Sequence, residues 1–380
     1  MSFSKRVKRI ILLVRCLLRA IFYGAANQIP SNISRIMVVP TGKLGDVVCC
    51  TPVLYTIRTY LPQARIIVAG NSKLHRPLLS DSGLVDEYLD LKEKGVIKRI
   101  KGYHAEAALV TGPSYEPTAL LYLAGIPLVV APQVVGGFSP SETLPYKILQ
   151  RLIKTFPYRI DEYAPRERLK ALEPLGIISL DTKKHLGFSE TADKKAKQFF
   201  IDNGLDIKKD FVVGISVSAG SKIKEWPEER FAEVADYLAA TYEAKIIIIG
   251  GPGDREQVKK TKSHLRSETK AIEVTDFNID ELKALVAKLG LFVSADTGPI
   301  YIAEAFDVPT IDIVGPVDER VQPPRGLIHR SVVPKRVRAE VFILNAQMYN
   351  REEAIRQVLS ISVQDVLKEI DGLMRDLHRV

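Results

Sequence analysis

This chain of 380 residues has few cysteines and lacks the common sequence motifs of metal-binding, redox and nucleotide-binding proteins. The chain has three cysteines, of which Cys49 and Cys50 are adjacent and none forms a C-x-x-C pair. This usage argues against a zinc site and predicts reduced thiols in a cytosolic protein. The G-x-G-x-x-G fingerprint of dinucleotide-binding domains is absent, and so is the full P-loop pattern.

Acidic residues are missing from residues 1–45, where eight Lys or Arg occur. The formal net charge is +9, so the remainder of the chain is nearly neutral. A nucleic-acid-binding surface would require a wider spread of positive charge, and we therefore expect no nucleic-acid partner.

The basic segment 5–23 has the pattern of an amphipathic helix, with most of its large apolar residues facing away from its cations. Five of its cations, Lys5, Lys8, Arg9, Arg15 and Arg19, fall within one arc of the helix. The apolar run that they interrupt is too short to span a membrane. The pattern favours a helix lying on an anionic membrane surface. A helix packed on the protein itself and a signal or anchor sequence stay open as alternatives.

Two series of short apolar strands alternate with helical segments, a pattern typical of doubly wound α/β domains with parallel sheets. The first series comprises residues 35–39, 65–69, 87–91, 105–111 and 126–131. The second comprises residues 211–216, 245–249, 271–274 and 291–294. Residues 144–175 look helical, carry many charges and contain prolines such as Pro157, Pro165 and Pro174, and we expect them to connect the domains.

We predict four parts of the chain from this pattern. They are the basic helix 1–30, an N-terminal domain 31–180, a C-terminal domain 181–350, and terminal helices 351–380 that pack back on the N-terminal domain.

Residues 40–46 (Pro-Thr-Gly-Lys-Leu-Gly-Asp) form a glycine-containing loop after the first strand, and a helix is expected over 47–60. The loop places Asp46 at the start of that helix. Asp is a favoured capping residue, but a carboxylate at the carboxyl end of a strand can also act as a general base. Spacing alone leaves both interpretations of Asp46 open.

The loop after strand 211–216 combines small residues such as Ser218 with Lys222 and Lys224. Backbone N–H groups and an ammonium group suit a diphosphate, although exposed lysines are also common in ordinary loops. After strand 245–249, Asp254 and Glu256 open a helix and either accept ribose hydroxyls or cap that helix.

The stretch 291–306 is predicted to be a strand, a turn and a buried helix, and the turn is Asp296-Thr297-Gly298-Pro299. Pro suits the first helical position, and a helix that begins at such a turn presents free N–H groups and its positive end. The turn therefore suits a phosphate or a sugar hydroxyl, or it is an ordinary strand–helix connection.

Five of these segments occur together in one known family. Gly-Lys-Leu-Gly-Asp46 resembles the S-x-x-G-D-x loop of glycosyltransferase family 9, the heptosyltransferases of lipopolysaccharide core assembly. The block 224–231 (Lys-Glu-Trp-Pro-Glu-Glu-Arg-Phe) resembles its K-x-W-P-x-x-x-(F/W) motif. Segments 250–256, 296–299 and 314–318 resemble its later motifs, so the likeness runs in order from about residue 34 to 320.

The resemblance implies a GT-B fold, in which two doubly wound (Rossmann-like) domains face a cleft and bind the acceptor and the nucleotide sugar respectively. It also implies an inverting transfer without a metal, and the chain has no D-x-D motif. Asp46 would be the base, Lys224 with Thr297 and Gly298 would hold the diphosphate, and Asp296 a hydroxyl of the donor sugar. The predicted donor-binding residues are Ser218, Lys222, Lys224, Asp254, Glu256, Asp296, Thr297, Gly298 and Pro299, and the acceptor-side loop contains Gly42, Lys43 and Gly45.

The default donor is ADP-heptose, with no cofactor and no metal. Tyr301 stands where the family usually has His, and Lys43 where small hydroxyl residues are common, so another ADP-, GDP- or UDP-linked sugar stays open. The basic helix indicates a lipid-linked glycan acceptor, such as the lipopolysaccharide core, met at the inner face of a bacterial cytoplasmic membrane. A GT-B sugar-nucleotide 2-epimerase and a non-catalytic membrane adaptor are the alternatives.

Overall fold

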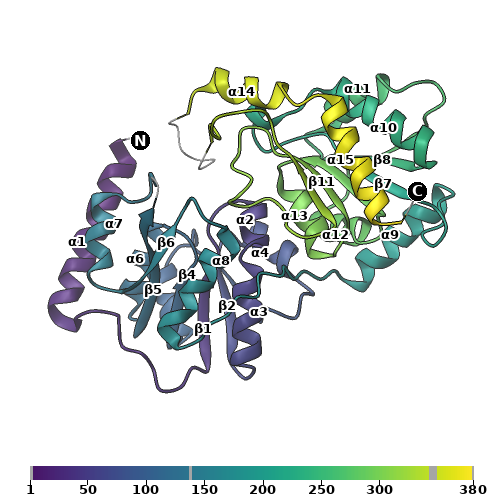
Figure 1. The fold of residues 1–380 in the computed structure, drawn as a ribbon. Coiled ribbons are helices and arrows are strands. Elements are labelled where there is room, and N and C mark those ends of the chain that lie inside the picture. Colours follow the sequence, from purple (N-terminus) through teal and green to yellow (C-terminus); the bar gives the residue numbers. More distant parts are fainter. Residues whose placement is uncertain (1–2, 137–138, 342–348, 379–380) are drawn as a thin grey trace. The chain divides into compact units, whose positions relative to one another are not determined.

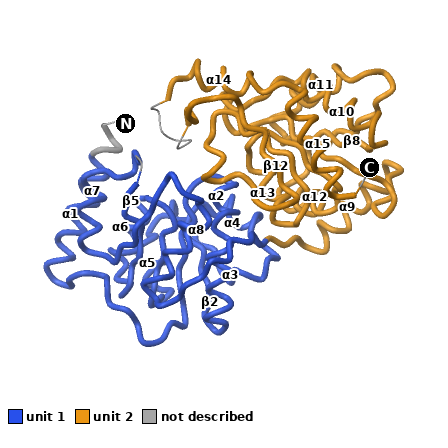
Figure 2. Tube along the Cα trace, viewed as in Figure 1, with its two compact units in different colours: residues 1–185 blue, residues 186–380 orange. Residues whose placement is uncertain are grey.

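The computed structural model describes residues 3–136, 139–341 and 349–378, and the chain divides into two compact units. Unit 1 is Met1–His185 and unit 2 is Leu186–Val380 (Figure 2).

Unit 1 contains one parallel six-stranded sheet in the order β3-β2-β1-β4-β5-β6 (Figure 1). Its strands are β1 (Arg35–Val39), β2 (Arg65–Gly70), β3 (Glu87–Asp90), β4 (Ala107–Val110), β5 (Leu128–Gly136) and β6 (Lys154–Arg159). Its helices are α1 (Phe3–Tyr23), α2 (Leu44–Val48), α3 (Thr51–Tyr60), α4 (Ser72–Leu79), α5 (Val96–Gly102), α6 (Tyr115–Ala124), α7 (Leu144–Gln150) and α8 (Ala164–Leu169), followed by the 3₁₀ helix η1 (Lys170–Leu175).

Unit 2 repeats this architecture with the strand order β12-β11-β10-β7-β8-β9, again parallel. Its strands are β7 (Val212–Ser216), β8 (Lys245–Ile249), β9 (Ala271–Val274), β10 (Leu291–Ala295), β11 (Thr310–Ile313) and β12 (His329–Val332). Its helices are α9 (Glu190–Asp202), η2 (Lys222–Lys224), α10 (Glu228–Tyr242), α11 (Arg255–Ser263), α12 (Ile279–Val286), α13 (Gly298–Ala305), α14 (Arg351–Leu359) and α15 (Val363–Asp376).

Each sheet has a topological switch point, where the chain leaves one half of the sheet to build the other. The switch lies between β1 and β4 in unit 1 and between β7 and β10 in unit 2. Ligands of open α/β sheets bind outside the carboxyl ends of the strands at such points. In both units the loops singled out from the sequence begin at these strand ends.

The prediction that residues 144–175 only connect the domains is wrong. They form α7, β6, α8 and η1, and β6 pairs with β5 at the edge of the sheet. In β6, Phe156 and Tyr158 are buried and alternate with more exposed neighbours, and such a short alternation is easily hidden among prolines and charges.

The C-terminal helices belong to unit 2, and the prediction that they return to the N-terminal domain is wrong. Val366, Ile370 and Leu373 of α15 are buried in the same core as strands β7, β8, β10 and β11. The indole N–H of Trp226 donates to the carbonyl of Ile361, just before α15, at 3.0 Å. Trp226 is therefore a core residue that attaches the terminal segment to its own unit.

Helix α1 packs on α6 and α7 of unit 1 through one face. Cys16 is fully buried, Leu12 and Leu13 pack beside it, and the Arg19 guanidinium lies 4.5 Å from the ring centre of Tyr122. The opposite face exposes a continuous apolar surface, formed by Val7, Ile10, Ile11, Val14, Leu17, Leu18, Ile21 and Phe22. The helix thus packs on the protein and still presents an apolar face to its surroundings. No helix among the described residues is both long and apolar enough to cross a bilayer.

Candidate functional site

The first candidate cluster lies at the carboxyl end of β1 and centres on Asp46. The helix here begins at Leu44, earlier than predicted, so that Asp46 stands at the third position of α2. Its Oδ2 accepts the backbone N–H of Lys43 at 2.9 Å, which satisfies one free N–H at the helix start. Asp46 is therefore not the N-cap residue, which is Lys43, but it caps the start of the helix from the third position, while its second carboxylate oxygen has a different partner.

That partner is Arg168 of α8, whose Nη2 lies 2.9 Å from Asp46 Oδ1. Its Nη1 also donates to the carbonyl of Thr41 at 3.3 Å, on the same loop. The guanidinium is buried, and although burial by itself lowers the pKa of Arg168, Tyr158 and Asp46 raise it, with a net rise. Arg168 is thus charged and fixes both ends of the 41–46 loop.

Gly42 allows this close packing. Its φ is +107°, and a Cβ built there would lie 2.3 Å from the Asp46 carboxyl carbon. Any larger residue would displace the carboxylate, so Gly42 is required for the position of Asp46. Gly45 is buried within α2, and Lys43 is its exposed N-cap residue.

Arg168 was missed because its segment, Pro165-Arg-Glu-Arg-Leu169, was interpreted as part of a charged connection. The structure shows that two of the charged residues in this short helix, Glu167 and Arg168, are buried. Charged residues are rarely buried unless they are paired. A sequence does not state which charges in such a run are buried, so the pair with Asp46 becomes visible only in the fold.

The second candidate cluster lies at the carboxyl ends of β7 and β10 in unit 2. The Lys224 ammonium group, in η2, donates to the Asp296 carboxylate and to the backbone carbonyl of the same residue. Tyr301 of α13 donates its hydroxyl to the other oxygen of Asp296. All three side chains are buried. The structure therefore joins two predicted donor residues, and Tyr301, at the position where the family has His, completes the network.

A further carboxyl group, Asp312 on β11, lies next to this network and was not predicted. Ser294 of β10 is its register partner, and the side chain is fully buried. Neither carboxyl oxygen of Asp312 has a hydrogen-bond partner in the described part of the chain. Burial, and then the nearby Asp296 charge, raise the pKa of Asp312 well above its usual range. Asp312 is hence a buried carboxyl group next to the Lys224–Asp296 pair whose surroundings favour its protonated form.

The predicted residues Ser218 and Asp254 form a separate pair at the ends of β7 and β8. The Ser218 hydroxyl donates to Asp254 Oδ2 at 2.8 Å, and the backbone N–H of Gly251 donates to the same oxygen at 2.8 Å. Asp254 is the N-cap residue of α11, and its carboxylate closes the Gly-rich turn. It connects two neighbouring loops of the predicted donor side.

The remaining predicted residues are more open. Lys222 and Glu256 are exposed, and within the described ranges neither side chain forms a hydrogen bond or an ion pair. Thr297 is the N-cap of α13, and Gly298 and Pro299 are its first two residues, all of them partly exposed. The first N–H groups of an α-helix have no partner within the helix, so this turn offers donors to an anion.

Nowhere in the described ranges do three His, Cys, Asp or Glu side chains form a group arranged to hold a metal ion. In the described part of the chain, none of the three cysteines forms a disulfide, and all three are buried. Burial raises the pKa of the Cys16 thiol to about 11 and also raises that of Cys50.

Comparison with known proteins gives concordant matches. Residues 118–338 match the model of the family described as glycosyltransferase family 9 (heptosyltransferase). Lipopolysaccharide heptosyltransferase 3 of Escherichia coli K12 is 23% identical over 284 residues, which cover 72% of this chain and 80% of that protein.

Two solved structures share the fold. A glycosyl transferase family 9 protein from Veillonella parvula superposes with a TM-score of 0.73 at 23% identity, covering 90% of this chain and 98% of the other. The ADP-heptose lps heptosyltransferase II of E. coli superposes with a TM-score of 0.69 at 18% identity, covering 90% and 99%. Together with the two parallel sheets, these likenesses confirm the predicted GT-B fold.

Proposed function

The chain belongs to glycosyltransferase family 9, and from this membership we propose that it transfers a heptose from ADP-heptose, with inversion and without a metal, to a lipid-linked glycan such as a lipopolysaccharide core. Because the chain is a glycosyltransferase, the two alternative functions considered above, a sugar-nucleotide epimerase and a non-catalytic adaptor, are not proposed. The donor is proposed because the E. coli structure with the same fold carries ADP-heptose in its name.

In the proposed reaction, an acceptor hydroxyl gives its proton to Asp46 while its oxygen bonds to the anomeric carbon of the donor. The bond from that carbon to the diphosphate breaks on the opposite face, and ADP leaves with the bonding electron pair. Attack opposite the leaving group inverts the anomeric centre. General-base assistance of this kind contributes on the order of 10²–10⁴-fold.

On the donor side, the departing diphosphate gains negative charge as the bond breaks. We propose that the N–H groups at the start of α13 and the Lys224 ammonium stabilise this charge. Lys224 is bonded to Asp296 in the structure, so the Asp296 carboxylate orients the ammonium, and Tyr301 in turn orients Asp296. Asp254 and Ser218 are proposed to position the nucleoside.

The observation that carries this proposal is the ion pair between Asp46 and the buried Arg168. A carboxylate that is 30% exposed and fixed by a buried arginine at a topological switch point is placed to meet a substrate hydroxyl. A residue that served only as a helix cap would not need the guanidinium of Arg168.

We also propose that the exposed apolar face of α1 docks the enzyme on a membrane, where a lipid-linked acceptor would be found. Lys8 and Arg15 are exposed on the same helix and suit anionic headgroups. In this arrangement the packed face of α1 attaches the anchor rigidly to unit 1.

The test is a donor screen followed by turnover. Thermal-shift measurements with ADP-heptose, GDP- and UDP-linked sugars should show the largest stabilisation with ADP-heptose, because the shift follows affinity. Incubation with that donor and a lipopolysaccharide core acceptor should then release ADP and add one heptose in the inverted configuration. If only a GDP- or UDP-linked sugar stabilised the protein, ADP-heptose would be the wrong donor. If the product retained the anomeric configuration of the donor, the inverting mechanism would be wrong.

A further inference from the structure

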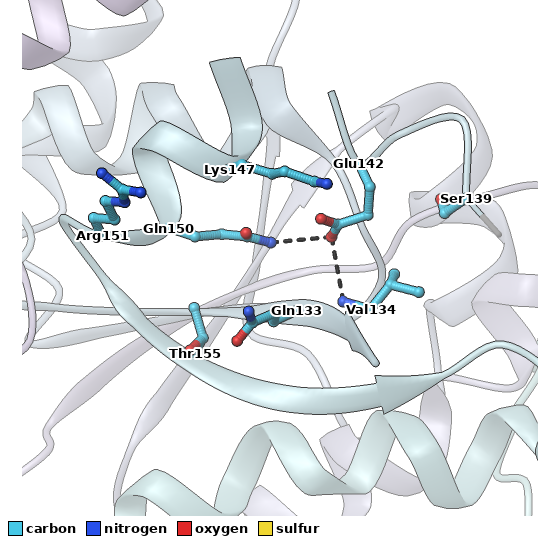
Figure 3. Close-up of a pocket in the computed structure, with 8 residues that line it drawn as sticks. All are labelled: Gln133, Val134, Ser139, Glu142, Lys147, Gln150, Arg151 and Thr155. Carbon is cyan, nitrogen blue, oxygen red and sulfur yellow. Dashed lines mark hydrogen bonds between the residues drawn. The ribbon is translucent and has the colours of Figure 1, made fainter. Parts of the chain in front are cut away.

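Unit 1 contains a cavity of about 610 Å³ beside helix α7. Helix α7 and its C-cap contribute Lys147, Gln150 and Arg151 on one side, and β5 and β6 contribute Gln133 and Thr155 on the other (Figure 3). Neither Asp46 nor any of the predicted donor residues lines this cavity.

The cavity is lined by two cations, Lys147 and Arg151, and by one carboxylate, Glu142. Lys147 and Arg151 are four residues apart, so they share one face of the helix. Both are exposed, and in the described part of the chain neither lies within ion-pair distance of a carboxylate. Lys147 extends toward Glu142 and Arg151 lies at the other end of the cavity, with Gln150 between them (Figure 3), so an anionic ligand that fills the hollow can accept N–H bonds at either end.

The wall behind these cations is fixed by a hydrogen-bond network. The side-chain amide of Gln150 donates to Glu142 Oε1 at 3.0 Å and to the carbonyl of Pro132 at 3.2 Å. The N–H of Val134 donates to the same Glu142 oxygen at 3.3 Å (Figure 3). Glu142 therefore holds the wall together, and its second oxygen is left to accept hydrogen bonds from ligand hydroxyls.

The polar lining indicates the chemistry of the ligand. Ser139, Thr155 and Gln133 offer hydroxyl and amide groups next to the cations. The volume exceeds that of a bare phosphate and lies in the range of pockets that hold small organic ligands. A phosphate ester with several hydroxyls satisfies both the cations and the neutral polar groups.

The apolar surface near the cavity indicates which class of molecule carries such a phosphate ester. Helix α1 packs against α7, so the exposed apolar face of α1 and the cavity belong to neighbouring helices (Figure 1). Leu144, the first residue of α7, is 72% exposed. An apolar surface next to a cationic, hydroxyl-binding hollow matches the two parts of a lipid, its acyl chains and its headgroup.

We infer that the α7 cavity binds the hydroxyl-bearing phosphate headgroup of an anionic membrane lipid, with Lys147 and Arg151 as its two cationic contacts. This site rests on the membrane docking proposed above and makes that docking selective for anionic, hydroxyl-rich lipids.

The test uses a short-chain lipid below its micelle concentration, so that binding does not require a vesicle. Calorimetric titration of the full chain with dihexanoyl phosphatidylglycerol should show saturable binding. The variant Lys147→Gln/Arg151→Gln should weaken it by at least ~10-fold, since two charge-assisted hydrogen bonds are lost. The matched control Lys98→Gln/Lys101→Gln removes two exposed α5 cations and should change affinity by no more than about twofold, the worth of exposed charges.

Equal weakening in the two double variants, or none in the first, would overturn the site. A soluble sugar phosphate that binds through Lys147 and Arg151 more tightly than the lipid would overturn the lipid assignment. If the full chain does not bind vesicles but binds the short-chain lipid through these cations, the membrane-docking proposal is wrong and the lipid site in the cavity is still supported.

Discussion

Arg168 and Asp46 form an ion pair in which the two partners differ sharply in exposure. The Arg168 side chain is 4% exposed and that of Asp46 is 30% exposed, with 2.9 Å between Nη2 and Oδ1. The cation is therefore part of the interior, whereas the carboxylate reaches solvent. Loss of the carboxylate leaves a buried charge without its partner, but loss of the arginine leaves a carboxylate that water can solvate.

The first prediction concerns Asp46→Asn. This change removes the proposed base, so kcat should fall by about 10²-fold or more. It also removes the countercharge of Arg168, so the free energy of unfolding should fall by about 1–3 kcal/mol. ADP-heptose affinity, measured by calorimetry, should change little because the proposed donor residues lie on unit 2.

The control for Asp46→Asn is the double variant Asp46→Asn/Arg168→Met, which removes the buried charge as well. It should recover part of the lost stability and none of the lost turnover. If activity returns with stability, or if Asp46→Asn turns over at the wild-type rate, Asp46 is only a structural residue.

The second prediction compares two lysines of one loop. Lys224→Met should weaken ADP binding by about 1.5–3 kcal/mol, the worth of a hydrogen bond to a charged group. Lys222→Met, which removes an exposed cation two residues away, should weaken it by less than about 1 kcal/mol. The reverse order in calorimetric titrations would move the diphosphate to Lys222 and leave Lys224 as the structural partner of Asp296.

The sequence was sufficient to predict most strands and the loops that follow them. Strands such as β1, β8 and β10 are continuous apolar runs, as expected for buried parallel strands. Strand β6 is different, because it lies at a sheet edge, carries Pro157 and alternates in burial. Its pattern is too short to stand out from the charges around it, and so a sheet strand was mistaken for a connection.

The site was predictable to the extent that its residues follow strands directly. Asp46, Lys224 and Asp296 lie in the segments that follow β1, β7 and β10, the first two in α2 and η2 and the third in the turn before α13. Their partners come from distant segments: Arg168 lies 122 residues from Asp46 in the chain, and Lys224 lies 72 residues from Asp296. Such pairings are set by the packing of helices on the sheets, which a single sequence does not specify.

The third prediction concerns pH and His75, whose side chain is 3% exposed under the end of β2. Burial lowers the pKa of His75 to about 4, against a small opposing effect of Asp90. Because the unfolded chain binds the proton first, stability should be complete above about pH 6.5 and be lost as the pH falls toward 4, by about 3 kcal/mol in total.

The comparison that isolates this effect is His75→Leu, which cannot titrate and keeps an apolar group in the same space. The difference in unfolding free energy between wild type and variant should be constant above pH 6.5 and should shift in favour of the variant by about 1.4 kcal/mol per pH unit below it. A difference that stays flat from pH 7 to 4 would show that His75 is not held neutral in the fold.

The last prediction concerns the apolar face of α1. Deleting the helix would uncover α6 and remove Cys16 from the core, so point substitutions on the exposed face are the sharper test. Ile11, Val14 and Leu18 are 54%, 48% and 53% exposed, and changing all three to Gln should leave the free energy of unfolding nearly unchanged. The same variant loses the apolar surface that would enter a bilayer, and its co-sedimentation with anionic vesicles should fall at least ~10-fold.

Lys8→Gln/Arg15→Gln is the matched variant on the same helix. Each cation near an anionic membrane surface contributes roughly 1 kcal/mol to the binding free energy. Salt screens this attraction, with a Debye length of about 10 Å at 0.1 M. The variant should therefore bind vesicles less than wild type at low salt and about as well as wild type at high salt. Wild type should stay partly bound at high salt, because the inserted apolar face is insensitive to screening. Full release of wild type by salt would make the contact purely electrostatic, and unchanged sedimentation of the triple Gln variant would place the membrane contact elsewhere on the protein.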